Sequence, residues 1–137
     1  MKKEKRYSGI LIKHKNKVLL CKRSEKKTRG GEWSIPSGGI ENDETPINAA
    51  YREFFEETGI EIDEEIQLTS MIAKMTRDGK KMKGLLYVYF CEVDEKFNVD
   101  LEFAEDGHEH TECGWFGLNE LPTPIGEQLK KVIIKHL

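Results

Sequence analysis

The sequence has few cysteines and no long hydrophobic run. Its 137 residues include three cysteines, Cys21, Cys91 and Cys113, which are far apart and form no pair with zinc-binding spacing. The odd number and wide separation predict reduced thiols, with Cys21 and Cys91 inside strands. No stretch approaches the roughly 20 apolar residues that span a membrane, and no apolar signal-peptide core follows the basic start MKKEKRYSG. These absences predict a cytoplasmic protein that does not bind membranes.

The sequence also lacks an excess of charge of one sign. Lys and Arg total 22 against 25 Asp and Glu, which gives a net charge of −3. A dedicated nucleic-acid binder usually shows a basic excess or stripe, so this balance argues against a nucleic-acid partner. The length suits a single domain over residues 1–137, and the 37% of hydrophobic residues are enough for one core.

Short apolar runs separated by turn residues predict a mixed α/β layered domain. Two runs before residue 24 read as a β-hairpin, and Pro36 with two glycines bends the next strand-like segment. The segment 94–112 is acidic and reads mostly as loop. The predicted strands cover residues 7–13, 17–23, 33–41, 66–78, 83–93 and 113–118, with a turn near Asp78–Gly79 between the fourth and fifth.

Two helices are predicted. Thr45 is a suitable N-cap, Pro46 fits the first helical position, and Gly59 is a natural stop after Thr58. The apolar residues of this helix, at 3–4 residue spacing, line one face for packing. They are Ile47, Ala50, Tyr51 and Phe54. A terminal helix is predicted over residues 126–137, with apolar Leu129, Val132, Ile133 and Leu137.

Three glutamates share another face of the first helix. Glu53, Glu56 and Glu57 stand at i, i+3 and i+4, where like charges cost a few tenths of a kcal/mol per pair. Crowded carboxylates are tolerated if a cation binds them, and Mg²⁺ prefers oxygen ligands completed by water and phosphate. Taken alone, the three glutamates could also form a solvated acidic face.

The surrounding residues separate these interpretations. Residues 38–60 read GGIENDETPINAAYREFFEETGI, which resembles the Nudix box, G-x5-E-x7-R-E-U-x-E-E-x-G-U with U apolar, at every defined position. The local departure is Asp43, where many members have Gly. The segments WSIPSGG and GWFGLNELP also look like this family. The chain is therefore identified as a MutT-like Nudix hydrolase, and the resemblance implies a Nudix α/β/α sandwich with a mixed sheet.

The resemblance implies a metal-dependent hydrolysis. The expected reaction is attack of a metal-activated water on the pyrophosphate bond of a nucleoside diphosphate linked to another group. Mg²⁺ is the expected cofactor, with Mn²⁺ as an alternative. Arg52 is expected to orient the glutamates, and Glu44 could bind metal through water or position the nucleophile. The implied metal ligands are Gly38, through its carbonyl, Glu44, Glu53, Glu56 and Glu57, and the implied catalytic residues include Arg52, Glu53, Glu56 and Glu57.

The general base and the phosphate contacts lie outside the box. Family members differ in their base, and here the acidic segment offers Glu105, Glu109 and Glu112, of which we favour Glu109 or Glu112. Arg23 is a candidate for a phosphate contact or, equally, for a salt bridge, and Arg29 and Lys27 are weaker candidates for the phosphate contact. His108 and His110 read as surface residues, and Trp33 and Trp115 as core or rim, although either Trp could stack on a base.

The resemblance does not select one substrate. Nucleoside triphosphates, nucleotide sugars, ADP-ribose and dinucleoside polyphosphates all fit the box chemistry. One alternative is a non-catalytic nucleotide sensor of the same fold. Another is an RNA 5′-end pyrophosphohydrolase, with which the basic stretch Lys22–Arg29 is compatible. Dimers are common in the family, so the resemblance is compatible with a homodimer.

Overall fold

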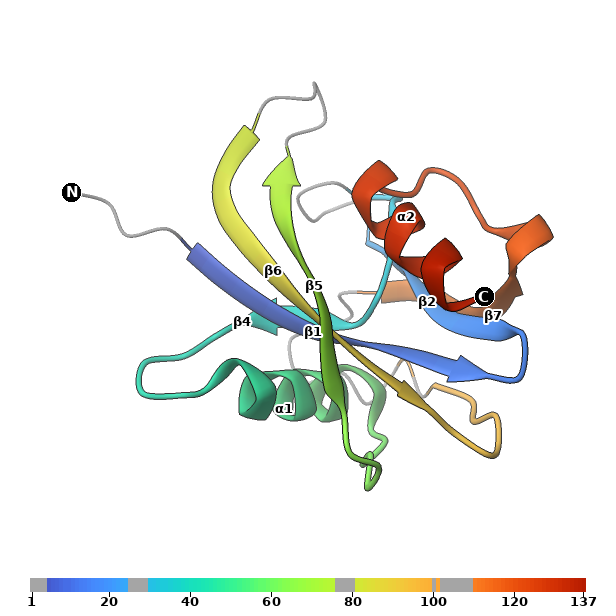
Figure 1. Ribbon diagram of the computed structural model, residues 1–137, viewed down its shortest axis with the longest axis horizontal. Helices are drawn as coiled ribbons and strands as arrows, with labels where there is room; N and C mark the ends of the chain where they lie inside the picture. The colour runs from blue at the N-terminus through green and yellow to red at the C-terminus, as the bar shows by residue number, and fades with distance from the viewer. Residues whose placement is uncertain (1–4, 25–29, 76–80, 100, 102–109) are drawn as a thin grey trace.

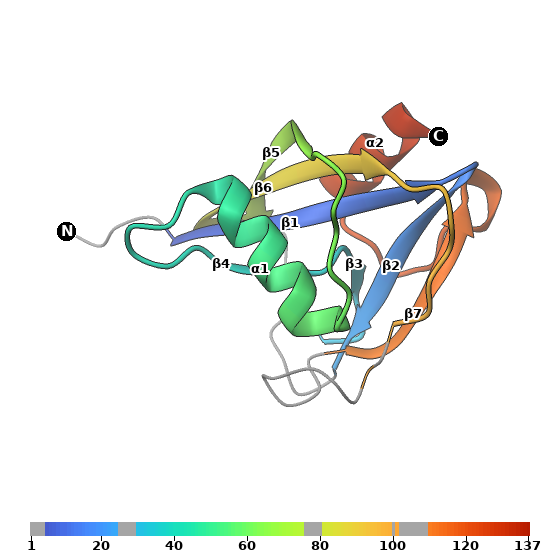
Figure 2. The ribbon, with the colours of Figure 1, turned by 90° about the horizontal axis from the view of Figure 1, so that it is seen from below.

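A mixed β-sheet lies between two helices in the computed structural model of the chain (Figure 1), which describes residues 5–24, 30–75, 81–99, 101 and 110–137. The helices α1 (Pro46–Thr58) and α2 (Glu127–His136) cover opposite faces of the sheet (Figure 2). The predicted mixed-sheet α/β architecture is confirmed. The described strands are β1 (Lys5–His14), β2 (Lys17–Arg23), β3 (Trp33–Ser34), β4 (Ser37–Gly39), β5 (Gln67–Met75), β6 (Lys81–Glu92) and β7 (His110–Gly117), and a 3₁₀ turn, η1 (Leu118–Glu120), follows β7.

The N-terminal hairpin is shorter than the sequence predicts. β1 and β2 pair only at the turn, through Lys13 with Val18 and His14 with Lys17. Beyond that point β1 pairs in parallel with β6 and antiparallel with β4, while β2 pairs antiparallel with β7 and β3. These partners come from distant parts of the chain, so local sequence pattern does not reveal them.

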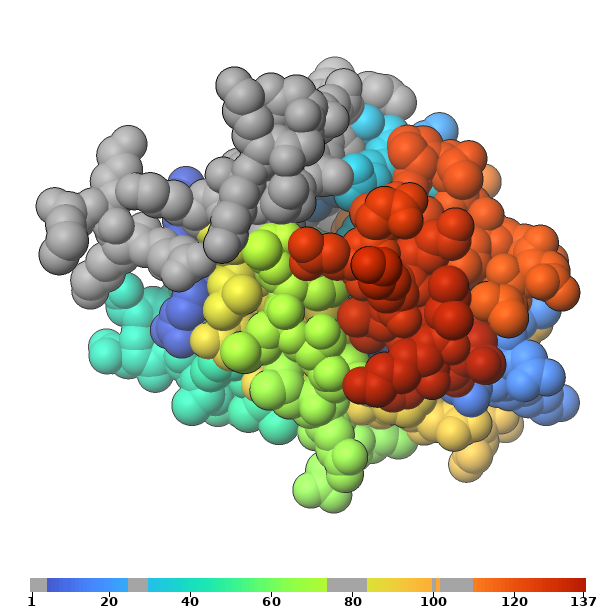
Figure 3. Space-filling model, turned by 45° about the horizontal axis from the view of Figure 1, so that its top comes forward, coloured from blue at the N-terminus to red at the C-terminus, as the bar shows by residue number. Residues whose placement is uncertain are grey.

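Alternation along β1 divides the core into two layers. Ile10 and Ile12 face α1, where they join Ala50 and Phe54, and Leu11 faces α2, where it joins Ile133. The predicted apolar stripes of both helices are thus confirmed. Figure 3 shows α2 lying beside β5 on the outer surface.

Strand pairing overturns the prediction for two of the cysteines. Cys21 of β2 and Cys113 of β7 are direct partners in the antiparallel register and form a disulfide across 92 residues of sequence. The prediction of reduced thiols was wrong for this pair, because sequence spacing carries no information on which strands are neighbours. Cys91 is a free, buried thiol, and burial, with a smaller contribution from Glu64, raises its pKa to about 12.

Strand β7 begins at His110, three residues before the predicted start at Cys113. The prediction of a loop holds for residues 94–99, and the predicted turn near Asp78–Gly79 lies outside the described residues. In the part of the chain that the structure describes, no helix is both long and apolar enough to cross a membrane.

Candidate active site

Helix α1 is anchored to the sheet at its start. The buried Ser8 hydroxyl of β1 donates to the carbonyl of Pro46 at 2.6 Å, and the predicted Thr45 cap accepts from the Asn48 N–H at 3.3 Å. Gly59 ends the helix with φ of 74°, as predicted. Asp43, in the turn before the helix, has φ of 66°, a left-handed conformation in which Gly costs least and Asp is tolerated. Glu53, Glu56 and Glu57 of the box therefore occupy fixed positions along one helix.

Arg52 holds the box glutamates together. Its Nε and Nη2 donate to the two carboxylate oxygens of Glu44 at 2.7 and 2.9 Å, and its Nη1 donates to Glu53 at 2.8 Å and Glu56 at 3.1 Å. Nη2 also donates to the Gly39 carbonyl at 2.9 Å, which ties the helix to β4. The hydrogen bond from Arg52 holds the pKa of Glu44 below its usual value, and these carboxylates in turn raise the pKa of Arg52.

Gly38 provides the space into which the Glu53 carboxylate fits. Glu53 is only 6% exposed, and a Cβ added at Gly38 would overlap its carboxylate atoms. A Cβ at the neighbouring Gly39 would meet no atom within 4 Å. Any side chain at position 38 would therefore displace Glu53, whereas position 39 tolerates one.

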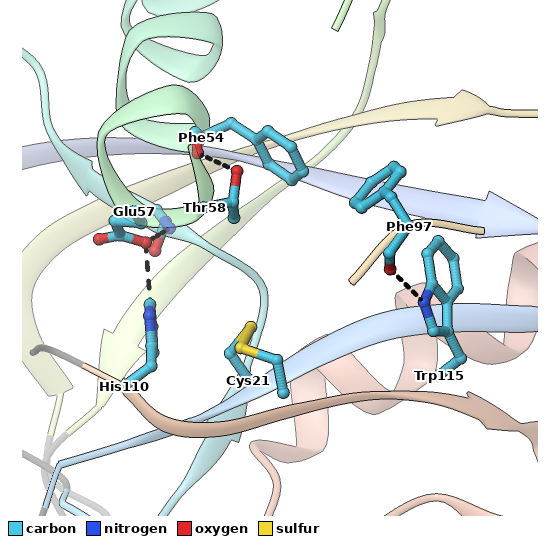
Figure 4. Close-up of a disulfide and its surroundings, with 9 residues drawn as sticks. Cys21, Phe54, Glu57, Thr58, Phe97, His110 and Trp115 are labelled. Atoms are coloured by element: carbon cyan, nitrogen blue, oxygen red, sulfur yellow. Dashed lines mark hydrogen bonds and ion pairs between the residues drawn. A yellow bond between two sulfur atoms is a disulfide. The ribbon is translucent and has the colours of Figure 1, made fainter. Parts of the chain in front are cut away.

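Glu57 is buried on the sheet side of the helix. It is 1% exposed, and its Oε2 accepts a hydrogen bond from the Ser37 N–H of β4 at 3.1 Å. His110, 5% exposed at the start of β7, places its Nε2 3.8 Å from the same oxygen, and Figure 4 shows the two side chains pointing toward each other. The prediction of His110 as a surface residue was wrong. Because β7 was predicted to begin at Cys113, His110 was assigned to the acidic loop.

Only some of the loop residues predicted as general base, phosphate contact or surface histidine are described by the structure. Glu105, Glu109, Lys27, Arg29 and His108 lie outside the described residues.

The structure places the described candidates Glu112 and Arg23 at the β2–β7 edge of the sheet. Glu112 is exposed and pairs with Lys22, whereas His110 pairs with Arg23 across a register shift. Adjacent residues of β2 point to opposite faces, so the shift sends Glu112 to the face opposite His110 and Glu57. Arg23 instead is the strand neighbour of His110.

The tryptophans serve as packing groups, in line with their prediction as core or rim. Trp33 is buried on the α2 side, with Phe116 edge-on at 5.2 Å between ring centroids. The Trp115 Nε1 donates to the carbonyl of Phe97 at 3.1 Å, which fastens the segment after β6 to β7. A polar partner for the indole N–H is what a partly buried tryptophan needs.

A groove of about 530 Å³ opens beside β4, next to the Arg52 contact with Gly39. The lining formed by the described residues mixes both signs of charge. Among the lining residues are Lys5, Arg6, Tyr7, Gly39, Glu41 and Asp43.

Comparison with known proteins agrees with this architecture. The NUDIX domain family model matches residues 3–137. The chain is 28% identical to an RNA pyrophosphohydrolase of Bartonella henselae, over 96% of this chain and 86% of that protein. It is 41% identical to the RNA pyrophosphohydrolase of Bartonella tribocorum, but that match spans only 37% of this chain and 32% of the relative. An 8-oxo-dGTP diphosphatase of Proteus vulgaris is 38% identical over 40% of this chain and 49% of the relative.

Solved structures share the fold. The MutT NUDIX hydrolase of Burkholderia pseudomallei superposes with a TM-score of 0.80 at 24% identity, covering 99% of this chain and all of the other. At that identity the likeness establishes the fold alone.

Proposed function

The chain belongs to the NUDIX family and is a hydrolase acting on pyrophosphate bonds, and we propose that it cleaves, with Mg²⁺, a nucleoside diphosphate linked to another group. The observation that carries this proposal is the Arg52 cluster, which holds Glu44, Glu53 and Glu56 together beside the buried Glu57. A solvated acidic helix face would not bury Glu53 and Glu57.

The chemistry of the donor set suits a hard divalent cation, although among the described residues no three acidic, histidine or cysteine side chains converge on one metal position. Carboxylate oxygens of Glu53, Glu56 and Glu57, with Glu44 and the Gly38 carbonyl nearby in the box, are the oxygen ligands that Mg²⁺ prefers, and Mn²⁺ accepts the same set. The space at Gly38 that the Glu53 carboxylate occupies supports the fit. Such a cation neutralises charge on phosphate oxygens and lowers the pKa of water.

The protein's own groups take the remaining roles in this proposal. Arg52 keeps the carboxylates in place and offsets their repulsion, and Arg23 at the end of β2 binds a phosphate oxygen, with Arg29 as a further contact. Glu109 accepts the proton of the attacking water. We favour it over Glu112, because the β2–β7 register turns Glu112 toward the opposite face of the sheet.

We further infer that the substrate is a small nucleotide. The mixed charge of the groove beside β4 and the net charge of −3 favour a small nucleotide over a long polyanion. The names of the Bartonella relatives support RNA with a 5′-triphosphate as the second candidate. RNA binding through several phosphates would weaken steeply with salt, with a log–log slope of about −0.7 per phosphate contact.

The test is product formation from a panel of nucleoside triphosphates, nucleotide sugars, ADP-ribose, dinucleoside polyphosphates and 5′-triphosphate RNA, with Mg²⁺ and with EDTA. We expect metal-dependent turnover of one class. Glu57→Gln should lower it by about 10²–10³-fold, with the thermal midpoint nearly unchanged, because the carboxylate charge is lost but the shape remains. The matched control is Glu127→Gln at the start of α2, on the other face of the sheet, which should keep full activity.

Two results would contradict the proposal. Near wild-type turnover by Glu57→Gln would refute the assignment of the metal site. Binding of one nucleotide, seen as a raised thermal midpoint, without turnover of any substrate would instead establish the non-catalytic sensor.

A further inference from the structure

Two groups from different strands converge on one oxygen of Glu57. The Ser37 N–H of β4 donates to Glu57 Oε2 at 3.1 Å, and His110 Nε2 of β7 lies 3.8 Å from the same atom. Glu57 and His110 are both almost completely buried. The carboxylate thus sits between its own helix on one side and two strands on the other (Figure 4).

The position of His110 is set by the sheet. His110 is the strand partner of Arg23, and the register shift beside it is what turns its side chain toward α1. Three residues further along β7, the disulfide between Cys113 and Cys21 joins the same two strands covalently. Ser37 is fixed independently, because β4 pairs with β1 through Gly9 and Ser37. The backbones that carry the two groups facing Oε2 are therefore each held in place by strand pairing.

We propose that His110 is a positioning residue for Glu57. Together with the Ser37 amide it restricts rotation of the Glu57 carboxylate, so that the carboxylate presents one orientation to the divalent cation. The inference rests on the proposed function, in which Glu57 is a metal ligand. Groups that orient metal-binding side chains in this way typically contribute 10–100-fold to metal affinity. The 3.8 Å separation is within ion-pair range when the imidazole is protonated and is longer than a hydrogen bond, and long hydrogen-bonding contacts at active sites can tighten when a ligand binds.

The test compares two amide substitutions that differ by one methylene. In His110→Gln the side-chain N–H₂ reaches the place of Nε2, whereas in His110→Asn it falls short. Mn²⁺ alone is the probe, and its affinity is measured by electron paramagnetic resonance on the full chain. We expect His110→Asn to weaken Mn²⁺ binding about 10-fold or more and His110→Gln to stay within about 3-fold of the unmodified protein.

Activity supplies a second readout that a purely structural role would not change. If His110 acts through the cation, raising the Mg²⁺ concentration should restore most of the turnover of His110→Asn but not that of Glu57→Gln. His136→Gln, at a half-buried histidine on α2, is the matched control and should change neither Mn²⁺ affinity nor Mg²⁺ dependence. Both His110 variants keep a polar side chain, and their thermal midpoints report whether they fold.

The outcomes separate this inference from the proposed function. If Glu57→Gln weakens Mn²⁺ binding while both His110 variants bind like the unmodified protein, the positioning role is refuted and the metal site stands. If Glu57→Gln leaves Mn²⁺ affinity unchanged, the proposed metal site is refuted, and this inference with it. Equal loss in His110→Gln and His110→Asn would also overturn the positioning role, because the longer amide should rescue it.

Discussion

At the scale of single residues, Arg52 is the reason that the box glutamates can stand so close together. Its guanidinium donates to Glu44, Glu53 and Glu56 at 2.7–3.1 Å, in the planar fork geometry that suits carboxylates. Helix spacing predicts repulsion among Glu53, Glu56 and Glu57, and the structure shows that an i,i+4 contact from Arg52 to Glu56 offsets part of it.

Gly38 offers a sharp test of this arrangement. Gly38→Ala should displace the Glu53 carboxylate and lower turnover and Mn²⁺ affinity about 10–100-fold, because the added methyl group overlaps that carboxylate. Gly39→Ala is the matched control, since an added Cβ there meets no atom within 4 Å. Steady-state kinetics and metal titration of the two variants would measure the difference. Equal turnover and equal Mn²⁺ affinity of the two variants would contradict the position of the Glu53 carboxylate against Gly38.

At the scale of elements, α1 was predictable because its signals are local. The Thr45 cap, Pro46 at the first position and Gly59 at the end are all short-range features, and the structure has the helix at Pro46–Thr58. Strand partners, in contrast, could not be predicted from local signals. β7 was placed too late in the sequence, and its pairing with β2, which creates the disulfide and brings His110 to Glu57, has no local signature.

The disulfide between β2 and β7 should stabilise the fold measurably. It closes a loop across 92 residues, and a crosslink of this kind restricts the unfolded chain by about 2–4 kcal/mol. Denaturant unfolding with and without dithiothreitol should show that loss in the unmodified protein. Cys113→Ala should unfold at the reduced midpoint and no longer respond to dithiothreitol. A reductant effect of the same size in both proteins would count against the crosslink.

Helix α2 should make stability depend on pH through His136. Its ring stacks on Phe90 at 3.9 Å and its Nε2 lies 2.7 Å from Thr69 Oγ1. Burial, with smaller contributions from Lys135 and Lys13, lowers the pKa of His136 from its usual 6.5. The folded state therefore binds this proton less readily than the unfolded chain, so its contribution to stability is complete above pH 6.5 and is lost as pH falls through the folded pKa.

The measurement is the free energy of unfolding between about pH 7 and about pH 5. His136→Gln should reduce its pH dependence in this range, because residue 136 can then no longer be protonated. Parallel curves for the variant and the unmodified protein would show that another group is responsible.

At the scale of the whole molecule, the sheet separates two apolar clusters. Ile12 belongs to the cluster under α1 and Ile133 to the cluster under α2, and both are fully buried. The same strands contribute to both clusters, so we expect the two layers to unfold together, as the prediction of a single domain requires.

Paired substitutions test this cooperativity. Ile12→Val and Ile133→Val should each lower the free energy of unfolding by about 0.5–1.5 kcal/mol, the usual effect of deleting one buried methylene. The double variant should equal their sum within about 0.5 kcal/mol, because the two sites lie on opposite sides of the sheet. Fluorescence and circular dichroism should report one coincident transition. Two separate transitions would show that the layers fold independently.

The sequence by itself determined the parts of this protein that depend on neighbouring residues. These are the box helix with its caps, the crowding of Glu53, Glu56 and Glu57 on one face, the Arg52–Glu56 spacing, and the family resemblance. Helix geometry is local, so a spacing of three or four residues already fixes which side chains meet.

Only the tertiary structure decided what lies opposite that helix face. It paired β2 with β7, placed Cys21 against Cys113 and brought His110 to Glu57, and its register shift turned Glu112 to the other face. These contacts join residues that are far apart in the chain. Strand pairing sets them, and the choice of partner strand has no local signature in the sequence.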